Sequence, residues 1–255
     1  MLLAIDAGNT NIVFAVFEGN TLVKQWRIST DARRTVDEYA LFLLGLMEVE
    51  GIKPGLIEGT IISTVVPPVL FPLTQLCKRY FDCKPLIVGT EQVVLDIRVM
   101  FNDRPSEVGS DRLVNSVAAF KKYGGDTVII DFGTATTFDV LSEKGDYLGG
   151  VIAPGINLSL EALHKAAAKL PNIAIEKPGA VIGKSTVSAM QSGIYWGYVG
   201  LIEGILARIQ KEMGRQMNVI ATGGLAPLFK EIELIKHLEL DLTMIGLQMI
   251  YEQNK

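Results

Sequence analysis

The first part of the chain carries short apolar stretches with the length and spacing of β-strands. They cover residues 2–6, 11–18 and 21–29, and the polar turn Glu18-Gly19-Asn20 between the last two is typical of a hairpin. Apolar residues then recur at helical spacing over about 35–50, where Thr35 and Glu38 form a capping box. The pattern predicts three antiparallel strands followed by a helix.

The remainder of this half alternates apolar runs with amphipathic segments. We predict a buried strand over 60–65, a helix from Pro67 to about Tyr80, a strand over 85–88 and a helix over about 107–122. The second half then starts the same order again.

In the second half, strands are expected over 127–131, 136–142 and 147–152, helices over about 155–168 and 184–213, and a strand over 217–221 before a short helix and a final strand–helix pair. This repetition predicts an α/β fold built from a duplicated βββαβαβα-type unit. No low-complexity linker separates the halves, so we expect two closely packed domains, 1–123 and 124–255, with the active-site cleft between them.

Each half also begins with the same acidic loop. In Asp6-Ala7-Gly8 and Asp131-Phe132-Gly133, an apolar strand ends in Asp and a Gly follows two residues later. The glycines permit tight turns whose backbone N–H groups can approach a phosphate. Side chains that can donate to phosphate oxygens come next: Asn9, Thr10, Asn11, Thr134, Thr136 and Thr137.

The aspartates of these loops indicate a cation. A carboxylate repels a phosphate directly, so hydrated Mg²⁺ or another cation between the two explains it best. A single Asp-x-Gly-Asn segment is also an ordinary turn, because Asp, Asn and Gly dominate turns. Two copies, each followed by an alternating strand, favour a pair of loops that bind one nucleotide phosphate chain, and therefore an ATP-dependent phosphotransferase.

Composition narrows the class of protein further. The 255 residues are 49% hydrophobic and 20% charged, as in a globular chain. The net charge is −4 and no basic run exceeds two residues, so we expect no nucleic-acid partner. The N-terminus reads as a strand and not as a signal peptide, and Cys77 and Cys83 match no zinc or redox motif, which suggests a reducing, cytoplasmic environment.

The predicted helix over 184–213 is unusually apolar. Residues 187–207 contain no Lys or Arg, yet Gln191, Ser192, Glu203 and several glycines argue against a membrane span. The glycines recur at helical spacing: Gly193, Gly197, Gly200 and Gly204. Because small residues let helices approach closely, we expect this helix to lie at an interface, in a homodimer.

A third candidate segment is Gly109-Ser-Asp-Arg112. Asp111 is expected in the first turns of a helix, where the positive end of the dipole favours a carboxylate. It can accept a proton from a hydroxyl while Arg112 attracts an anion, which suits a substrate that carries a hydroxyl and a carboxylate. A helix-start Asp that merely pairs with a neighbour has the same sequence.

With both loops identified, the chain resembles the superfamily of acetate and sugar kinases, actin and the heat-shock chaperone ATPases, which share two ribonuclease-H-like domains with ATP between them. Within it, the chain resembles type III pantothenate kinases along nearly its whole length. The matching segments, in the family's order, are Asp6-Ala-Gly-Asn-Thr10, Ser63-Thr-Val-Val-Pro-Pro68, Gly109-Ser-Asp-Arg112, Asp131-Phe-Gly-Thr-Ala-Thr-Thr137, Gly149-Gly-Val-Ile-Ala-Pro-Gly155, Gly183-Lys-Ser-Thr186 with Met190-Gln-Ser-Gly193, and Ala221-Thr-Gly-Gly-Leu225.

The resemblance implies roles for several of the matched positions. Asp111 is the proton acceptor, Asp131 holds an activating monovalent cation (K⁺ or NH₄⁺), and Asp6 holds Mg²⁺ through water. The implied ATP-binding residues are Asp6, Ala7, Gly8, Asn9, Thr10, Asn11, Ile12, Val13, Thr134, Gly223 and Gly224. The implied pantothenate contacts are Phe101, Gly109, Ser110, Asp111, Arg112 and, across a dimer interface, Thr186.

Two positions depart from the family pattern. The family commonly has Tyr in the pantothenate pocket, whereas this chain has Phe101, with one residue inserted near Asn102–Arg104. Ser110 stands where Ala is frequent. The first change removes a phenol hydroxyl from the expected pocket wall.

The resemblance implies transfer of phosphate from ATP to pantothenate, the first step of coenzyme A biosynthesis. A related kinase of sugars or hydroxy acids would share the loops, and an older name of the family suggests a transcriptional accessory factor. Gly183-Lys-Ser-Thr186 resembles the end of a Walker A motif, but Gly179 is one residue too close to complete it. His164 and His237 have no catalytic partner nearby in sequence and are expected on helix faces or the surface.

Overall fold

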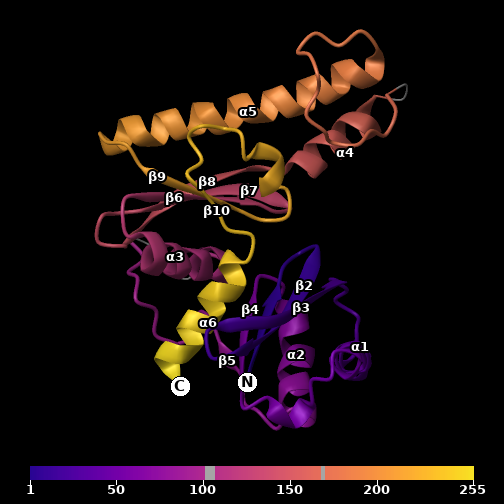
Figure 1. Cartoon of the computed structure of the whole chain (residues 1–255), viewed down its shortest axis with the longest axis vertical. Helices are drawn as coiled ribbons and strands as arrows, with labels where there is room; N and C mark the ends of the chain where they lie inside the picture. The colour runs from indigo at the N-terminus through magenta and orange to yellow at the C-terminus, as the bar shows by residue number, and fades with distance from the viewer. Residues whose placement is uncertain (101–106, 168–169) are drawn as a thin grey trace. The chain divides into compact units, whose positions relative to one another are not determined.

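The computed structural model describes residues 1–100, 107–167 and 170–255 (Figure 1). By its internal contacts the chain divides into two compact units. Unit 1 comprises Met1–Lys122 together with Leu242–Lys255, and unit 2 comprises Tyr123–Asp241. Phe101 and the insertion near it lie outside the described residues.

Unit 1 contains a five-stranded mixed sheet in the order β3-β2-β1-β4-β5. Its strands are β1 (Leu2–Ala7), β2 (Asn11–Glu18), β3 (Thr21–Ser29), β4 (Gly59–Thr64) and β5 (Leu86–Ile87). The pairs β1–β2 and β2–β3 are antiparallel, whereas β4 is parallel to β1 and β5 is parallel to β4. Because β1 and β4 are parallel, their carboxyl ends meet at one edge of the sheet.

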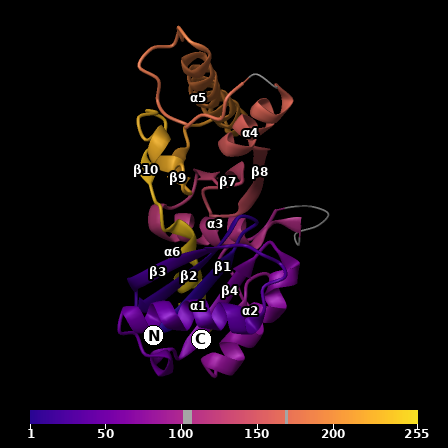
Figure 2. The same cartoon turned by 90° about the vertical axis from the view of Figure 1, so that its right-hand side faces the viewer.

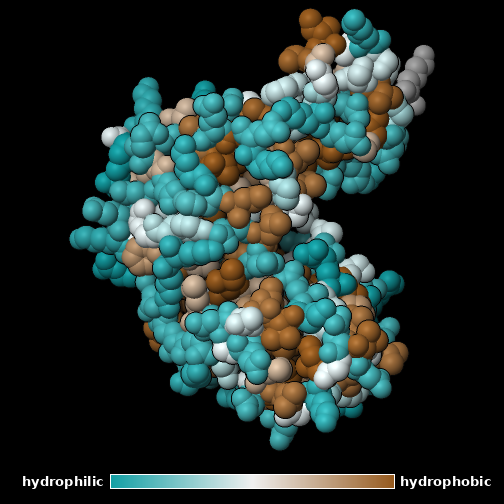
Figure 3. Space-filling view, in the orientation of Figure 1, coloured by the Kyte–Doolittle hydropathy of each residue, from teal (hydrophilic) through white to brown (hydrophobic). Residues whose placement is uncertain are grey.

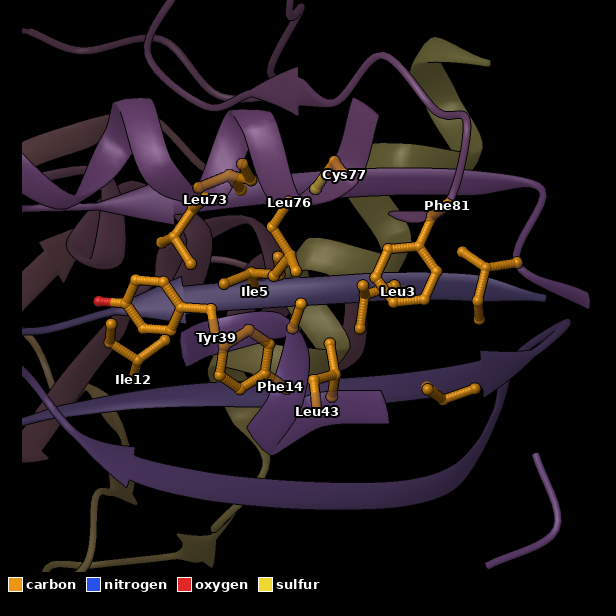
Figure 4. Packing of buried hydrophobic residues seen from close by; sticks show 14 of the residues in the cluster. Leu3, Ile5, Ile12, Phe14, Tyr39, Leu43, Leu73, Leu76, Cys77 and Phe81 are labelled. Carbon is orange, nitrogen blue, oxygen red and sulfur yellow. The ribbon is translucent and has the colours of Figure 1, made fainter. Parts of the chain in front are cut away.

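Helices α1 (Val36–Val49) and α2 (Pro67–Tyr80) bury the apolar side of this sheet. Side chains alternate in a strand, so Leu3 and Ile5 of β1 face the helices together, where they join Tyr39 of α1 and Leu73 of α2 in one cluster (Figure 4). The capping box predicted at the start of α1 is present, with Thr35 and Glu38 bonded to each other's backbone.

Helices α3 (Ser110–Tyr123) and α6 (Leu242–Asn254) complete unit 1. Helix α6 contacts β1 and β4. A Cβ on Gly246 would lie 2.4 Å from the carbonyl oxygen of Val114, so α6 and α3 approach each other closely. A Cβ on Gly59 would likewise lie against the ring of Tyr251, which places α6 directly on β4.

Unit 2 repeats this sheet, in the order β10-β9-β6-β7-β8. Its strands are β6 (Thr127–Phe132), β7 (Ala135–Leu141), β8 (Tyr147–Pro154), β9 (Asn218–Thr222) and β10 (His237–Leu238). As in unit 1, the first three strands are antiparallel neighbours and the later two are added in parallel. The predicted duplicated α/β architecture is confirmed.

The long helix α5 (Thr186–Met213) lies across this second sheet, and α4 (Ile156–Ala166) precedes it (Figures 1 and 2). Tyr195, Tyr198 and Ile202 of α5 pack with Ile130 and Phe138 of the sheet. Ser185 caps the helix at its start, and Gly214 ends it in the left-handed conformation. Within the described ranges, no helix is long and apolar enough to cross a membrane.

The two units differ from the domains expected at 1–123 and 124–255, since residues 242–255 belong to unit 1. The physical reason is that Gly246 and Tyr251 of α6 pack on α3 and β4. A terminal helix covers whichever apolar face is available to it, and apolar spacing along the helix does not say which face that is.

Candidate functional site

The first acidic loop lies at the carboxyl end of β1. Asp6 is the penultimate residue of the strand, and the backbone N–H of Gly8 donates to the carbonyl of Asn11 at 3.0 Å to close the turn. The hydroxyl of Thr30, the residue after β3, donates to the carbonyl of Gly8 at 2.6 Å and braces the turn. Asn9, Thr10 and Asn11 are exposed at its tip, as a phosphate-binding loop requires.

Two residues expected at this site face inward. Ala7 and Ile12 are fully buried members of the hydrophobic core. Their side chains therefore anchor both ends of the loop in the core, so direct side-chain contact with ATP is excluded for them. Asp6 and Val13, which are neighbours in the β1–β2 ladder, are only partly buried.

Asp111 lies in the first turn of α3, as predicted. The N–H groups of Arg112 and Leu113 both donate to the carbonyl of Gly109, and the N–H of Arg112 also donates to Oδ1 of Asp111 at 2.8 Å. A Cβ on residue 109 would lie 2.6 Å from that same Oδ1. Glycine at this position is what allows the carboxylate to fold back over the start of the helix.

Burial raises the pKa of the Asp111 carboxyl above its ordinary value, and the N–H and positive charge of Arg112 oppose this only partly. The helix start was expected to favour the charged carboxylate. Desolvation outweighs that effect, because the partly buried carboxyl has lost part of its contact with water. A carboxylate with a raised pKa is a stronger base, which suits proton abstraction from a hydroxyl.

The structure brings the first loop and Asp111 to the same edge of unit 1. Thr64, the last residue of β4, donates its hydroxyl to the carbonyl of Ala7 at 3.2 Å. Ser110 donates its hydroxyl to the carbonyl of Thr64 at 3.0 Å. Thus β4 stands between the phosphate loop and the start of α3, and hydrogen bonds join all three.

The second acidic loop occupies the equivalent place in unit 2, at the end of β6. Gly223, which follows β9, has φ +91°, and a Cβ on it would lie 2.6 Å from Oδ1 of Asp131. The expected cation ligand and the expected adenosine-side loop are therefore in contact. Gly155 approaches the loop from the end of β8, since a Cβ there would lie 2.2 Å from the carbonyl oxygen of Thr134.

Two hydroxyls of this loop do not point where the sequence suggested. Thr136 is buried and bonds the hydroxyl of Tyr198 on α5 at 2.6 Å. Thr137 donates to Oδ2 of Asp139 at 3.1 Å. The sequence allowed both to donate to phosphate, but each hydroxyl is hydrogen-bonded inside unit 2. Thr134 remains exposed.

The chain is similar along most of its length to proteins of one known family. The model of the type III pantothenate kinase family matches residues 2–208. A type III pantothenate kinase of Paramagnetospirillum magneticum is 59% identical over 255 residues, covering 100% of this chain and 98% of the relative. One of Rhodospirillum rubrum is 56% identical, with 100% and 99% covered.

The chain belongs to the type III pantothenate kinase family. Solved structures with the same fold include a conserved putative Baf family transcriptional activator from Campylobacter jejuni (TM-score 0.61, 18% identity, 99% and 98% of the two chains covered). Another is a putative 2-dehydro-3-deoxygalactonokinase from Sinorhizobium meliloti (TM-score 0.60, 13% identity, 99% and 96% covered). At these identities the likeness concerns the fold alone.

Membership in this ATP-dependent kinase family implies that the protein uses a divalent metal. Within residues 1–100, 107–167 and 170–255, no three His, Cys, Asp or Glu side chains gather as a metal site. A single carboxylate at the end of β1 fits a metal that keeps most of its waters and is bound chiefly through substrate phosphates. The donor set of this family member therefore fits a hydrated divalent ion and not an all-protein cage.

The resemblance of Gly183-Lys-Ser-Thr186 to a Walker A motif has a structural explanation. Ser185 is the N-cap of α5 and exchanges hydrogen bonds with Ser188. Gly183 packs on the first turn of that helix, where a Cβ would lie 2.3 Å from the backbone nitrogen of Ala189. No strand precedes the segment within 170–185. It is a helix start of this kinase, with Thr186 exposed on it.

Ser63 and Thr64 had no predicted role, although they open one of the segments that carry the resemblance. Their importance depends on β4 lying beside β1, where Asp6 pairs with Ser63 and Ala7 with Thr64. The available signal was a polar Ser-Thr pair at the end of a buried apolar strand. Gly155, which supports the second loop, also had no predicted role, because its approach to that loop depends on where β8 lies in the sheet.

Proposed function

We propose that the chain transfers the γ-phosphoryl group of ATP to the primary hydroxyl of pantothenate, which gives ADP and 4′-phosphopantothenate in the first step of coenzyme A biosynthesis. The observation that carries the mechanism is the position of Asp111. Its half-buried carboxyl lies at the start of α3, and a chain of hydrogen bonds through β4 connects that helix to the first acidic loop.

In the proposed step, Asp111 accepts the proton of the attacking hydroxyl. The hydroxyl oxygen forms a bond to the γ-phosphorus as the bond to the β–γ bridging oxygen breaks, and ADP leaves with that electron pair. Most of the rate enhancement in such transfers comes from positioning and electrostatics. Base catalysis contributes about 10²–10⁴-fold, and the raised pKa of Asp111 suits this task.

In this proposal, the exposed residues Asn9, Thr10 and Asn11 bind the phosphates, and Gly8 makes the tight turn that presents them. The turn is braced by Thr30 and by the core, so these donors are held in place before the nucleotide arrives. In unit 2, Thr134 is the proposed contact to ATP. Gly223 and Gly224 are the proposed adenosine-side contacts.

Two cations complete the proposed site. Mg²⁺ is held through water near Asp6, and K⁺ or NH₄⁺ is held at Asp131; when bound, they supply positive charge that offsets charge developing on the phosphates. The close approach of Gly223 supports the second assignment, because the backbone of Gly223 lies beside both the Asp131 carboxylate and the carbonyl of Phe132. Carbonyl and carboxylate oxygens are suitable ligands for such an ion.

Pantothenate carries a carboxylate besides its hydroxyl, and we assign that carboxylate to Arg112. Arg112 is the next residue after Asp111. The first turn of α3 therefore carries one group for the hydroxyl of pantothenate and one for its carboxylate. Gly109 and Ser110 form the rest of the helix start. Phe101, the expected pocket wall, lies outside the described residues.

We further propose that the kinase is a homodimer, with Thr186 of one subunit reaching the pantothenate site of the other. The segment before α5 presents apolar surface (Figure 3), where Val181 and Ile182 are 64% and 82% exposed. Val187, next to Thr186, is also exposed. Such surface on a single chain marks an interaction site. We expect the enzyme in the cytoplasm.

Two alternative functions would give different experimental results. A sugar or hydroxy-acid kinase would share the loops but not respond to pantothenate. A transcriptional role requires DNA or a regulator, and the net charge of −4 disfavours DNA. A coupled assay of ADP release, with and without pantothenate, separates these functions. Release that pantothenate fails to stimulate would refute the proposed activity.

A further inference from the structure

Three buried or half-buried hydroxyls connect the start of α3 to the first acidic loop. Ser110 has one hydroxyl hydrogen, and it goes to the carbonyl of Thr64 at 3.0 Å. The oxygen of Ser110 lies 3.0 Å from the oxygen of Ser63, so Ser63 is the donor in that pair. The side chain of Ser63 is fully buried, and Ser110 is 8% exposed.

The connection continues from β4 to the loop. The hydroxyl of Thr64 is shared between the carbonyls of Ala7, at 3.2 Å, and Val66, at 3.3 Å. In return it accepts from the N–H of Val66 at 3.0 Å, and the N–H of Val65 also donates to the carbonyl of Ala7. Thr64 is therefore bonded to the residue between Asp6 and Gly8.

The packing at the helix start leaves little room for adjustment. A Cβ on Gly109 would lie 3.3 Å from Cγ1 of Val65, as well as 2.6 Å from Oδ1 of Asp111. The start of α3 is thus pressed against the end of β4, with hydroxyl bonds that fix its position along the strand. A helix held only by apolar contacts could slide more easily, since those contacts are not directional.

From this geometry we infer that Ser110 and Thr64 are positioning residues, which hold the carboxylate of Asp111 at a fixed place relative to the phosphate loop. Ser110 thereby acts through the fold and not as a substrate contact, because its hydrogen is already donated within the chain. The inference rests on the proposed role of Asp111 as the base.

Two independent variants test it. Ser110→Ala removes the link between α3 and β4, and Thr64→Val removes the link between β4 and the loop. Each should lower kcat by about tenfold, because small misplacements of a base cost at least that much. The KM for pantothenate should change by less than about threefold, since neither hydroxyl binds substrate in this proposal. Thr64→Ser, which keeps the hydroxyl, should restore kcat.

Ser116→Ala is the matched control. Ser116 is a fully buried serine of the same helix, but its hydroxyl donates to the carbonyl of Arg112 within the helix, at 2.7 Å. Its loss should leave kcat within about twofold of wild type. Thermal unfolding of every variant shows that the compared proteins are folded. Equal effects of Ser116→Ala and Ser110→Ala on kcat would overturn the inference.

A double-mutant cycle with Asp111→Asn makes the test specific to the base. If Ser110 acts by positioning Asp111, Ser110→Ala should have almost no further effect once Asp111 is Asn. A full tenfold loss in the Asn background would show a merely structural role. An active Asp111→Asn enzyme would refute the proposed base. If Asp111→Asn is impaired and Ser110→Ala lowers its kcat by a further tenfold, only the positioning role is refuted.

Discussion

The backbone of Gly223 lies against the carboxylate of Asp131, so closely that a Cβ on residue 223 would be 2.6 Å from Oδ1 and 2.7 Å from the backbone of Phe132. The residue also has φ +91°, which only glycine adopts readily. The close contact between these two loops, which are far apart in the sequence, is possible only because residue 223 has no side chain.

Gly223→Ala should lower the free energy of unfolding by about 1–3 kcal/mol through backbone strain alone. It should also weaken ATP binding, because the loop and Asp131 must move apart. Gly89→Ala is the control, since Gly89 has φ +90° but a Cβ there meets no atom within 4 Å. Chemical denaturation and the KM for ATP measure the two effects. Equal behaviour of both variants would contradict the close approach.

Asp111→Asn should lower kcat by about two decades or more, because base catalysis contributes at least that much. In the wild type, activity should fall as the pH is lowered through the raised pKa of Asp111, since the protonated carboxyl accepts no proton. The pH dependence of kcat/KM should therefore show an acid limb above the ordinary pKa of Asp. Wild-type turnover by the purified variant would refute the assignment.

Asp111→Asn should lower activity but raise the stability of the folded protein. Because the folded pKa of Asp111 is raised, the folded protein binds a proton more tightly than the unfolded chain, and stability falls as the pH rises from the unfolded pKa through the folded one. Asn carries no charge to desolvate and keeps an oxygen for the N–H of Arg112. Asp111→Asn should therefore unfold at a higher temperature than wild type at neutral pH. The gain should shrink as the pH is lowered through the raised pKa, and a gain independent of pH would argue against a buried charge.

The proposed monovalent cation at Asp131 makes activity depend on the identity of the salt. At constant ionic strength and saturating Mg²⁺, replacing K⁺ with Na⁺ or tetramethylammonium should reduce kcat. Asp131→Asn should remove this dependence, because the charge that holds the ion is lost. Equal activity of the wild type in all three salts would exclude the cation role.

Gly197→Leu tests the proposed dimer. A Cβ on Gly197 meets nothing within 4 Å, so the change adds apolar bulk without a clash inside the chain. If α5 packs on a second copy through its glycines, the variant should become monomeric and inactive together. Gly45→Leu on α1, where a Cβ also meets open space, is the control. Light scattering and activity at the same concentration decide the matter, and an active monomer would sink the proposal.

Several features followed from the sequence because they depend on near neighbours. The capping box of Thr35 and Glu38 and the hairpin turn at Gly19 involve residues a few positions apart, so the local pattern determines them. The duplicated strand order was readable for the same reason, as each half repeats its own succession of turns and periodicities. The acidic loops and Asp111 at a helix start were equally local signals.

What only the tertiary structure decided is where side chains point once distant elements meet. Thr136 and Thr137 looked like phosphate donors, but Tyr198 of α5 and Asp139 engage their hydroxyls. Helix α6 comes at the C-terminal end of the sequence but belongs to unit 1, because it packs on the apolar face of β1 and β4. The bonds of Ser110 arise only when β4 lies between the phosphate loop and α3. Hydrogen bonds are directional and short-ranged, so a sequence shows which groups can form them, and the packing of remote segments selects the partners.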